Sequence, residues 1–238
     1  EKNFTIIDSD DVLTIIKKIL KDKNMSKDRY NPREIKNKIS SAKNEMMSID
    51  SFAKVEFDHK VVEVYKEYQQ KLKNGNSVDF DDLLILPIKL FRNYPRVLEE
   101  YQDRYKYILI DEYQDTNEAQ YTFSKLLSAK YRNIFVVGDN DQAIYAFRGA
   151  NYKNILNFEK DYPEAKTILL EENYRSTKTI LNAANSVIKN NHERKDKNLW
   201  SNNATGNKIK YKEVANEKEE ASFVGTEIKT LLSEGITQ

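Results

Sequence analysis

The sequence contains no cysteine and only two histidines, His59 and His192, among its 238 residues. Without cysteine the chain forms neither a disulfide nor a thiolate metal site, which fits a reducing compartment such as the cytoplasm. Two histidines leave almost no material for a zinc site or a Ser-His-Asp triad. No apolar run approaches the roughly 20 residues of a membrane span, so we expect no membrane partner. The net charge of +1 argues against nucleic-acid binding by bulk charge but does not exclude a local basic groove.

An initiating methionine is also missing, since the printed sequence begins at Glu1 with no signal-like segment. We therefore expect an internal piece of a longer protein. Hydrophobic residues make up 39% and charged residues 32%, which indicates a globular chain with room for one large domain or two smaller ones.

Residues 1–78 show the periodicity of helices. Apolar residues recur there at helical spacing in two groups, which are Val12, Leu13, Ile16, Ile19 and Leu20, then Val61, Tyr65, Tyr68 and Leu72. Asn31-Pro32 between the groups marks a turn or a helix start. The stretch KNGNS, residues 73–77, is the clearest break, and we place a domain boundary after residue 78.

The rest of the chain alternates short apolar runs with helical segments. The runs predict strands at 107–110, 133–138 and 166–171, and helices are expected at 82–92, 117–129, 151–160 and 177–190. A further strand at 208–214 and a helix at 216–233 close the chain. Strands separated by helices favour a parallel sheet covered by helices, so the predicted fold class is α/β.

The first predicted strand leads into acidic residues in ILIDEYQDT, residues 108–116. The carboxyl edge of parallel strands is where open α/β sheets bind ligands. At that edge Asp111 can hold Mg²⁺, and Glu112 can accept a proton from an attacking water. Two alternatives stay open at this point. One is a solvated acidic turn, and the other is a two-metal nuclease site with Asp115 as a third ligand.

The second predicted strand leads into VVGDNDQAIYAFRGA, residues 136–150. Gln142, just beyond the strand end, can orient a water against a terminal phosphate, as glutamines do in other nucleotide hydrolases. Tyr145 and Phe147 beside Arg148 suit base stacking and a phosphate contact. The alternative is that the two aromatic rings fill a core.

The third predicted strand is followed by ENYRST, residues 172–177. Arg175 lies just before a helix that Ser176 or Thr177 is expected to cap. An arginine in that position can reach across a cleft to a γ-phosphate and stabilise transferred charge, whereas the alternative is a surface salt bridge. Gln142 and Arg175 together favour nucleoside triphosphate hydrolysis over the nuclease.

Three stretches together resemble superfamily 1 DNA helicases of the PcrA/UvrD/Rep group, with its PcrA branch nearest: DEYQDTNEAQY (111–121), VVGDNDQAIYAFRGA (136–150) and LLEENYRSTKTILNAANSVI (169–188). DFDDLL (79–84) and SAKNE (41–45) also agree, so the resemblance covers essentially the whole chain. It implies an ATP-dependent DNA helicase and translocase of 3′ to 5′ polarity that uses ATP and Mg²⁺. The implied partners are single-stranded and 3′-tailed duplex DNA, RNA polymerase, and repair or replication-initiator proteins. The implied location is the bacterial cytoplasm, in association with the nucleoid.

The resemblance also implies a role for each motif residue. Asp111 would bind Mg²⁺ together with Glu112, and Glu112 would be the general base of ATP hydrolysis. Gln142 would sense the γ-phosphate. Tyr174 would stack near the adenine, and Arg175 would contact the γ-phosphate. The single-stranded DNA channel would be lined by Tyr145, Phe147 and Arg148.

The same resemblance implies three domains. Residues 1–78 would be the helical subdomain 1B, inserted into the first motor domain. Residues 79–172 would be the C-terminal half of that motor domain, 1A, and residues 173–238 the start of the second, 2A. The fold would be a partial RecA-like α/β motor. Because strands upstream of 1B would be missing, we expect the exposed sheet to be covered by a partner chain or rearranged.

Two substitutions and one missing loop depart from the pattern of this group. Ala143 stands where the group has serine, and Phe147 stands where it has tryptophan, which leaves a smaller stacking face. None of the six glycines is followed by lysine, so the phosphate-binding loop G-x-x-x-x-G-K-[ST] is absent from these residues. We therefore expect the 238 residues alone to have no ATPase activity.

A different function stays open for the 238 residues by themselves. They would be a non-catalytic module that binds DNA or a protein. In that case four lysines near the start of the chain either meet backbone phosphates or form a solvated helix face: Lys17, Lys18, Lys21 and Lys23.

Overall fold

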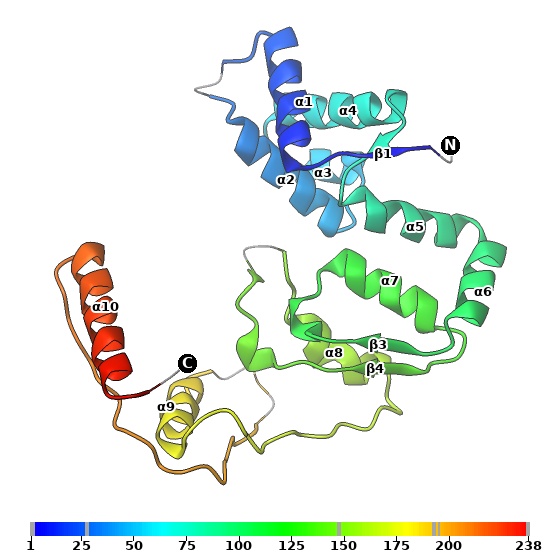
Figure 1. The fold of residues 1–238 in the computed structure, drawn as a ribbon. Helices are drawn as coiled ribbons and strands as arrows, with labels where there is room; N and C mark the ends of the chain where they lie inside the picture. Colours follow the sequence, from blue (N-terminus) through cyan, green and yellow to red (C-terminus); the bar gives the residue numbers. More distant parts are fainter. Residues whose placement is uncertain (1–2, 27–28, 147–148, 192–193, 195, 237–238) are drawn as a thin grey trace. The chain divides into compact units, whose positions relative to one another are not determined.

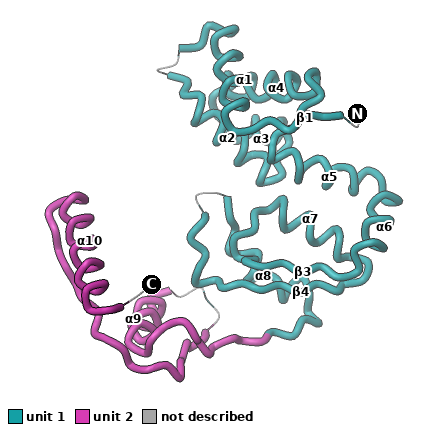
Figure 2. The backbone as a smooth tube through the Cα atoms, viewed as in Figure 1, with its two compact units in different colours: residues 1–167, 193–195 teal, residues 168–192, 196–238 magenta. Residues whose placement is uncertain are grey.

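The computed structural model describes residues 3–26, 29–146, 149–191, 194 and 196–236. The chain divides into two compact units, residues 1–167 with 193–195 and residues 168–192 with 196–238 (Figure 2). The architecture is a mixture of helices and short parallel strands, which confirms the predicted α/β class. Within the ranges that the structure describes, no helix is both long and apolar enough to cross a membrane.

Four helices form the first part of the first unit (Figure 1): α1 Ser9–Asp22, α2 Pro32–Asn44, α3 Ile49–Val55 and α4 His59–Asn74. Each begins with a polar side chain that accepts hydrogen bonds from backbone N–H groups of the first turn; these caps are Asp8, Asn31, Ser48 and Asp58. Such caps satisfy N–H groups that have no partner within the helix, so the sequence itself defines where these helices start.

One hydrophobic core holds the four helices together. Ile16, Ile19, Val64 and Tyr68 have 0% of their surface exposed. Full burial of one such side chain stabilises the fold by roughly 1.5–3 kcal/mol. Of the periodic residues that the sequence singles out, all but the half-buried Leu13 belong to this core.

A short pair of strands that the sequence does not predict closes this helical part. Strand β1, Thr5–Ile6, pairs in parallel with β2, Ser77–Val78. Two residues are too few to show the alternation of a strand. The pair places the chain before α1 beside the chain after α4, so the helical part begins and ends at the same place.

Helices α5 Asp82–Asn93, α6 Pro95–Arg104 and α7 Glu118–Ser128 follow. Ile85 and Ile88 on α5 form a small core with Ala119 on α7. The rings of Phe91 and Phe123 stack on the same two helices with centroids 5.8 Å apart. The helices expected at 82–92 and 117–129 are confirmed to within a residue or two.

Strands β3 Ile108–Ile110 and β4 Ile134–Val136 lie side by side in parallel, with Ile108 opposite Ile134 (Figure 1). They confirm the strands expected at 107–110 and 133–138, in shorter form. Helix α8, Lys153–Asp161, follows the second strand. Residues on one face of the pair are half-buried, whereas Leu109 and Phe135 on the other face are 72% and 61% exposed. This face of the strand pair is therefore uncovered, and whether a partner chain covers it stays a prediction.

The second unit contains helices α9 Lys178–Ile188 and α10 Glu217–Ser233, close to the expected ranges. The strands expected at 166–171 and 208–214 are wrong, because neither stretch forms a strand. A strand requires a hydrogen-bonded neighbour, and the nearest pairing is an isolated bridge between Glu172 and Trp200. Ile168, Leu170 and Tyr211 of these stretches are exposed.

Candidate active site

The turn after β3 presents the two expected carboxylates, Asp111 and Glu112. Both are exposed, and the backbone N–H of Glu112 donates to Asp111 Oδ1 over 2.9 Å. Glu112 has φ 49 and ψ 44, in the left-handed region. This conformation costs a residue with a Cβ about 1–2 kcal/mol, and strained residues of this kind cluster at functional sites.

The side chain of Gln114 holds this turn in place. Gln114 lies in the short 3-10 helix η1, Tyr113–Asp115, which follows Glu112. Its side chain is 1% exposed. Its amide nitrogen donates to Glu112 Oε2 over 2.6 Å, and its amide oxygen accepts the backbone N–H of Asp139 over 2.9 Å. Gly138 makes room for this amide, because a Cβ there would come within 2.7 Å of Gln114 Oε1. Sequence reasoning assigned no role to Gln114.

The turn after β4 carries Gln142 at the end of η2, Asn140–Gln142. Asp139 organises this turn: its carboxylate accepts the backbone N–H of Asp141 over 3.0 Å and the Gln142 side-chain nitrogen over 2.9 Å. Because β3 and β4 are parallel neighbours, both turns lie at the same edge of the sheet. The structure thus brings the turn with Asp111 and Glu112 and the turn with Gln142 to the same edge of the sheet.

An arginine that sequence reasoning missed also belongs to this turn. Arg194 Nη2 lies 3.1 Å from Asp141 Oδ2, and the two side chains are only 6% and 8% exposed. Arg194 follows α9 in sequence yet groups with the first unit. More than 50 residues separate Arg194 from Asp141 in the sequence, so no local pattern predicts this ion pair.

The aromatic stretch after Gln142 is described only in part. The Tyr145 side chain is 38% exposed, so it is not a core residue. Phe147 and Arg148, the other two expected DNA-binding residues, lie outside the described residues. Gly149 has φ 83, a value that favours glycine.

Tyr174 and Arg175 belong to the second unit. The Tyr174 side chain is exposed, and its hydroxyl donates to Glu172 over 2.8 Å; this hydrogen bond raises the pKa of Tyr174. Arg175 is exposed, and the structure shows no ion pair between it and another described residue. Thr177 occupies the N-cap position of α9, but its side chain makes no capping hydrogen bond. In the preceding turn, the Asn173 side chain accepts a hydrogen bond from the backbone N–H of Arg175.

The carboxylates in the turn after β3 fit a Mg²⁺ ion that is bound together with a nucleotide. Proteins usually hold this ion with one or two carboxylates while phosphate oxygens and waters complete the shell. Asp111 and Glu112 supply two carboxylates. Among the described residues no cluster of three or more carboxylate, imidazole or thiol groups is close enough to form a self-contained metal site.

A buried charged cluster connects α2 with the start of α5 and is formed by residues of SAKNE and DFDDLL. Lys43 Nζ lies 2.6 Å from Asp79 and 2.8 Å from Asp82, and the Tyr68 hydroxyl donates to Asp79 over 2.7 Å. Burial acts to raise the pKa of Asp79, but the Lys43 charge and the hydrogen bonds outweigh it and lower that pKa. Burial raises the pKa of Asp82.

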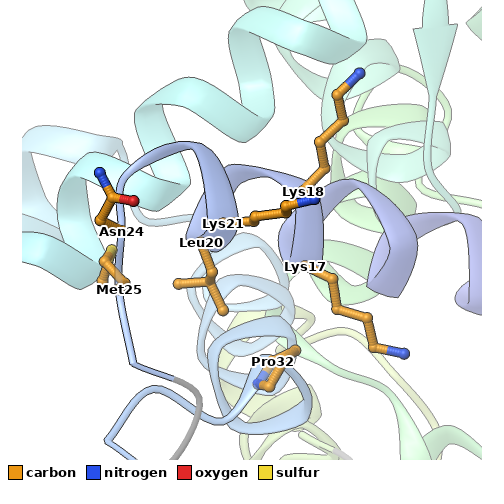
Figure 3. A pocket seen from close by; sticks show the side chains of 7 residues that line it. All are labelled: Lys17, Lys18, Leu20, Lys21, Asn24, Met25 and Pro32. Carbon is orange, nitrogen blue, oxygen red and sulfur yellow. The ribbon is translucent and has the colours of Figure 1, made fainter.

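A hollow on α1 gathers three of the four lysines noted in the sequence (Figure 3). It measures about 540 Å³ and is lined by Lys17, Lys18 and Lys21 with Leu20, Asn24, Met25 and Pro32. Lys23 does not line it and pairs instead with Glu63 and Glu67, at 3.6 Å and 3.3 Å.

Comparison with known families identifies the class. Residues 1–163 match the UvrD/REP helicase N-terminal domain, and residues 168–238 match the UvrD-like helicase C-terminal domain. The chain belongs to the UvrD/REP helicase family, which confirms the resemblance.

Among individual proteins, the chain is similar to PcrA helicases. The chain is 53% identical over 231 residues to the ATP-dependent DNA helicase PcrA of Staphylococcus aureus strain Mu50, and 52% identical over 231 residues to that of Staphylococcus epidermidis strain RP62A. Each alignment covers 96% of this chain and 32% of the relative. The chain thus spans about a third of the length of these relatives.

Proposed function

We propose that these residues are part of an ATP-dependent DNA helicase that moves along single-stranded DNA from 3′ to 5′ and unwinds duplexes. The observation that carries this proposal is the meeting of the Glu112 and Gln142 turns at one edge of the β3–β4 pair. Family membership and the likeness to proteins named as DNA helicases support it.

The side chains divide the chemistry between them. Asp111, with Glu112, would hold Mg²⁺, which supplies charge neutralisation on the phosphate oxygens when it is bound with ATP. Glu112 accepts the proton of the attacking water. Gln142, whose side chain donates to Asp139, would sense the terminal phosphate. Arg175 would stabilise the charge on that phosphate, and Tyr174 would stack near the adenine.

We assign residues 1–78 to subdomain 1B, 79–172 to the later half of motor domain 1A and 173–238 to the start of motor domain 2A. Tyr145, Phe147 and Arg148 are proposed to face single-stranded DNA. The parent protein would act at the bacterial nucleoid in the cytoplasm, with 3′-tailed duplexes, RNA polymerase and repair or replication-initiator proteins as partners.

The 238 residues alone are proposed to be inactive, because their sequence contains no phosphate-binding loop. The test compares the parent protein with the 238-residue chain in ATP hydrolysis and in strand displacement from 3′-tailed and 5′-tailed duplexes. The parent is expected to hydrolyse ATP with DNA stimulation and to unwind only the 3′-tailed substrate. Unwinding of the 5′-tailed substrate alone would overturn the polarity, and Mg²⁺-dependent cleavage of the DNA would favour the nuclease.

A second candidate applies to the 238 residues by themselves. The basic hollow on α1 favours a non-catalytic module that binds DNA backbone. Its signature is a duplex affinity that falls with salt, with a slope that decreases on reversal of Lys17 and Lys21 to Glu. The matched control is Lys23→Glu, at a lysine already paired with Glu63 and Glu67. An unchanged slope in the double variant would leave these lysines as solubilising charge.

A further inference from the structure

A continuous path of hydrogen bonds connects the two turns of the candidate site. Gln114 Nε2 lies 2.6 Å from Glu112 Oε2, and Gln114 Oε1 lies 2.9 Å from the backbone nitrogen of Asp139. The Asp139 carboxylate then accepts the Gln142 side-chain nitrogen over 2.9 Å. The path therefore joins the proposed general base to the proposed γ-phosphate sensor through one buried amide.

The chemistry of the two ends fixes the direction of that amide. A backbone N–H only donates, so the Gln114 oxygen must face Asp139. An ionised carboxylate only accepts, so the Gln114 nitrogen must face Glu112. A glutamine satisfies both ends at once, whereas glutamate, methionine or leucine at this position satisfies at most one.

The groups packed around the Gln114 side chain prevent its amide from adopting another position. Gln114 is 1% exposed and its neighbour Tyr113 is equally buried. A Cβ at Gly138 would lie 2.7 Å from Gln114 Oε1 and 2.8 Å from Ile155 Cδ1, so the glycine keeps the amide in position. Within the described part of the chain, no donor contacts the second carboxylate oxygen of Glu112, Oε1. That oxygen is open to a water while Oε2 is held.

We propose that Gln114 is a positioning residue: it orients Glu112 relative to the Gln142 turn, so that a shift of that turn is transmitted to the base. The inference rests on the proposed ATP hydrolysis and deepens it. A misplacement of about 1 Å at a reacting group can cost up to roughly 100-fold in rate without changing substrate binding. Loss of Gln114 is therefore expected to lower turnover and leave the affinity for ATP unchanged.

The first experiment uses the full-length protein and Gln114→Met, which keeps the length of the side chain and removes both hydrogen bonds. The kcat of DNA-stimulated ATP hydrolysis is expected to fall by about 10- to 100-fold, with KM for ATP within about twofold of wild type. The matched control is Gln102→Met. Gln102 is also buried, at 8% exposed, but donates to the backbone oxygen of Leu126 away from the site. It is expected to keep wild-type kcat.

Gly138→Ala is a second variant that disturbs the Gln114 side-chain amide. Its Cβ would displace Gln114, so kcat is expected to fall as in Gln114→Met. Combining the two substitutions is expected to add little further loss, because residues that act as one unit are not additive. Independent, additive losses would overturn the path. Equal kcat in Gln114→Met and Gln102→Met would also overturn it and leave Gln114 as a space-filling residue.

Glu112→Gln separates this inference from the proposed function. If Glu112→Gln hydrolyses ATP like the wild type, the proposed function itself fails. If Glu112→Gln is inactive while Gln114→Met keeps wild-type kcat, only the positioning role fails. Thermal unfolding of each variant accompanies the assay, and where Gln114→Met does not fold, Gly138→Ala carries the same comparison.

Discussion

The helical part of the first unit, residues 3–78, and its β3–β4 pair differ in how completely they bury their apolar residues. In the helical part, capped helices close around a core in which Ile16 and Val64 are fully buried. In the strand pair, Leu109 and Phe135 face solvent. The helical part therefore buries its own apolar residues, whereas the strand pair has an uncovered apolar face and carries the proposed catalytic residues in the turns at one edge.

The largest expected effect comes from the buried charges that connect the helical part with the start of α5. Lys43→Met leaves Asp79 and Asp82 buried without their ammonium group, and removal of one partner of a buried pair costs about 3–5 kcal/mol. The free energy of unfolding of the first unit in urea at pH 7 measures the loss. Lys17→Met, at an exposed lysine, is the control and is expected to change it by less than about 0.5 kcal/mol.

The same variant has a defined pH dependence. Without the Lys43 charge, we expect burial to raise the folded-state pKa of Asp79 relative to wild type and to raise that of Asp82 further. Stability from such groups is present at low pH and lost as pH rises through the folded pKa. The deficit of Lys43→Met relative to wild type is therefore expected to be smaller at about pH 4 than at about pH 7. A deficit that grows on acidification would contradict the assigned pairing.

The next effect tests the comparison itself with two alanine substitutions. Ile16→Ala removes a fully buried side chain and is expected to cost about 2–5 kcal/mol of unfolding free energy. Leu109→Ala removes one that is 72% exposed and is expected to change stability by less than about 0.5 kcal/mol. Denaturant midpoints at equal protein concentration give both values, and similar losses for the two variants would mean that the sheet face is covered in solution.

The smallest effect concerns the capping box at the start of α7. Asn117 accepts the N–H of Gln120 over 2.8 Å and donates to Asn44 over 2.8 Å, so Asn117→Ala is expected to cost about 1 kcal/mol. Asn216→Ala removes a similar cap from α10, which buries no residue. It is expected to leave the unfolding midpoint of the first unit unchanged, as monitored by thermal melting. Equal shifts of that midpoint would contradict the separation into two units.

The sequence predicts those parts of the fold that depend on local pattern. Helical periodicity locates α1 and α4, and the end of β3 correctly places Asp111 and Glu112 at the sheet edge. The strands expected at 166–171 and 208–214 are wrong, because apolar residues form a strand only when a neighbour supplies hydrogen bonds. Local pattern contains no information about such a neighbour.

The contacts that organise the site depend on tertiary structure and could not be predicted. Gln114 stands inside the first motif, but its role becomes visible only when Asp139 lies against it. The available signal was Gly138, a glycine at the end of the neighbouring strand, where close approach of another group requires the missing Cβ. Arg194 offers no such signal, because its partner Asp141 is far away in sequence.

The most direct test of the central claim, that Glu112 is the base of an ATP-hydrolysing site, is a single-turnover measurement on the full-length protein with saturating single-stranded DNA. Binding of ATP and its hydrolysis are followed separately in wild type and in Glu112→Gln. The account predicts that the variant binds ATP within a few-fold of wild type while the hydrolysis step slows by about 10²- to 10⁴-fold. Hydrolysis at the wild-type rate in Glu112→Gln would contradict it.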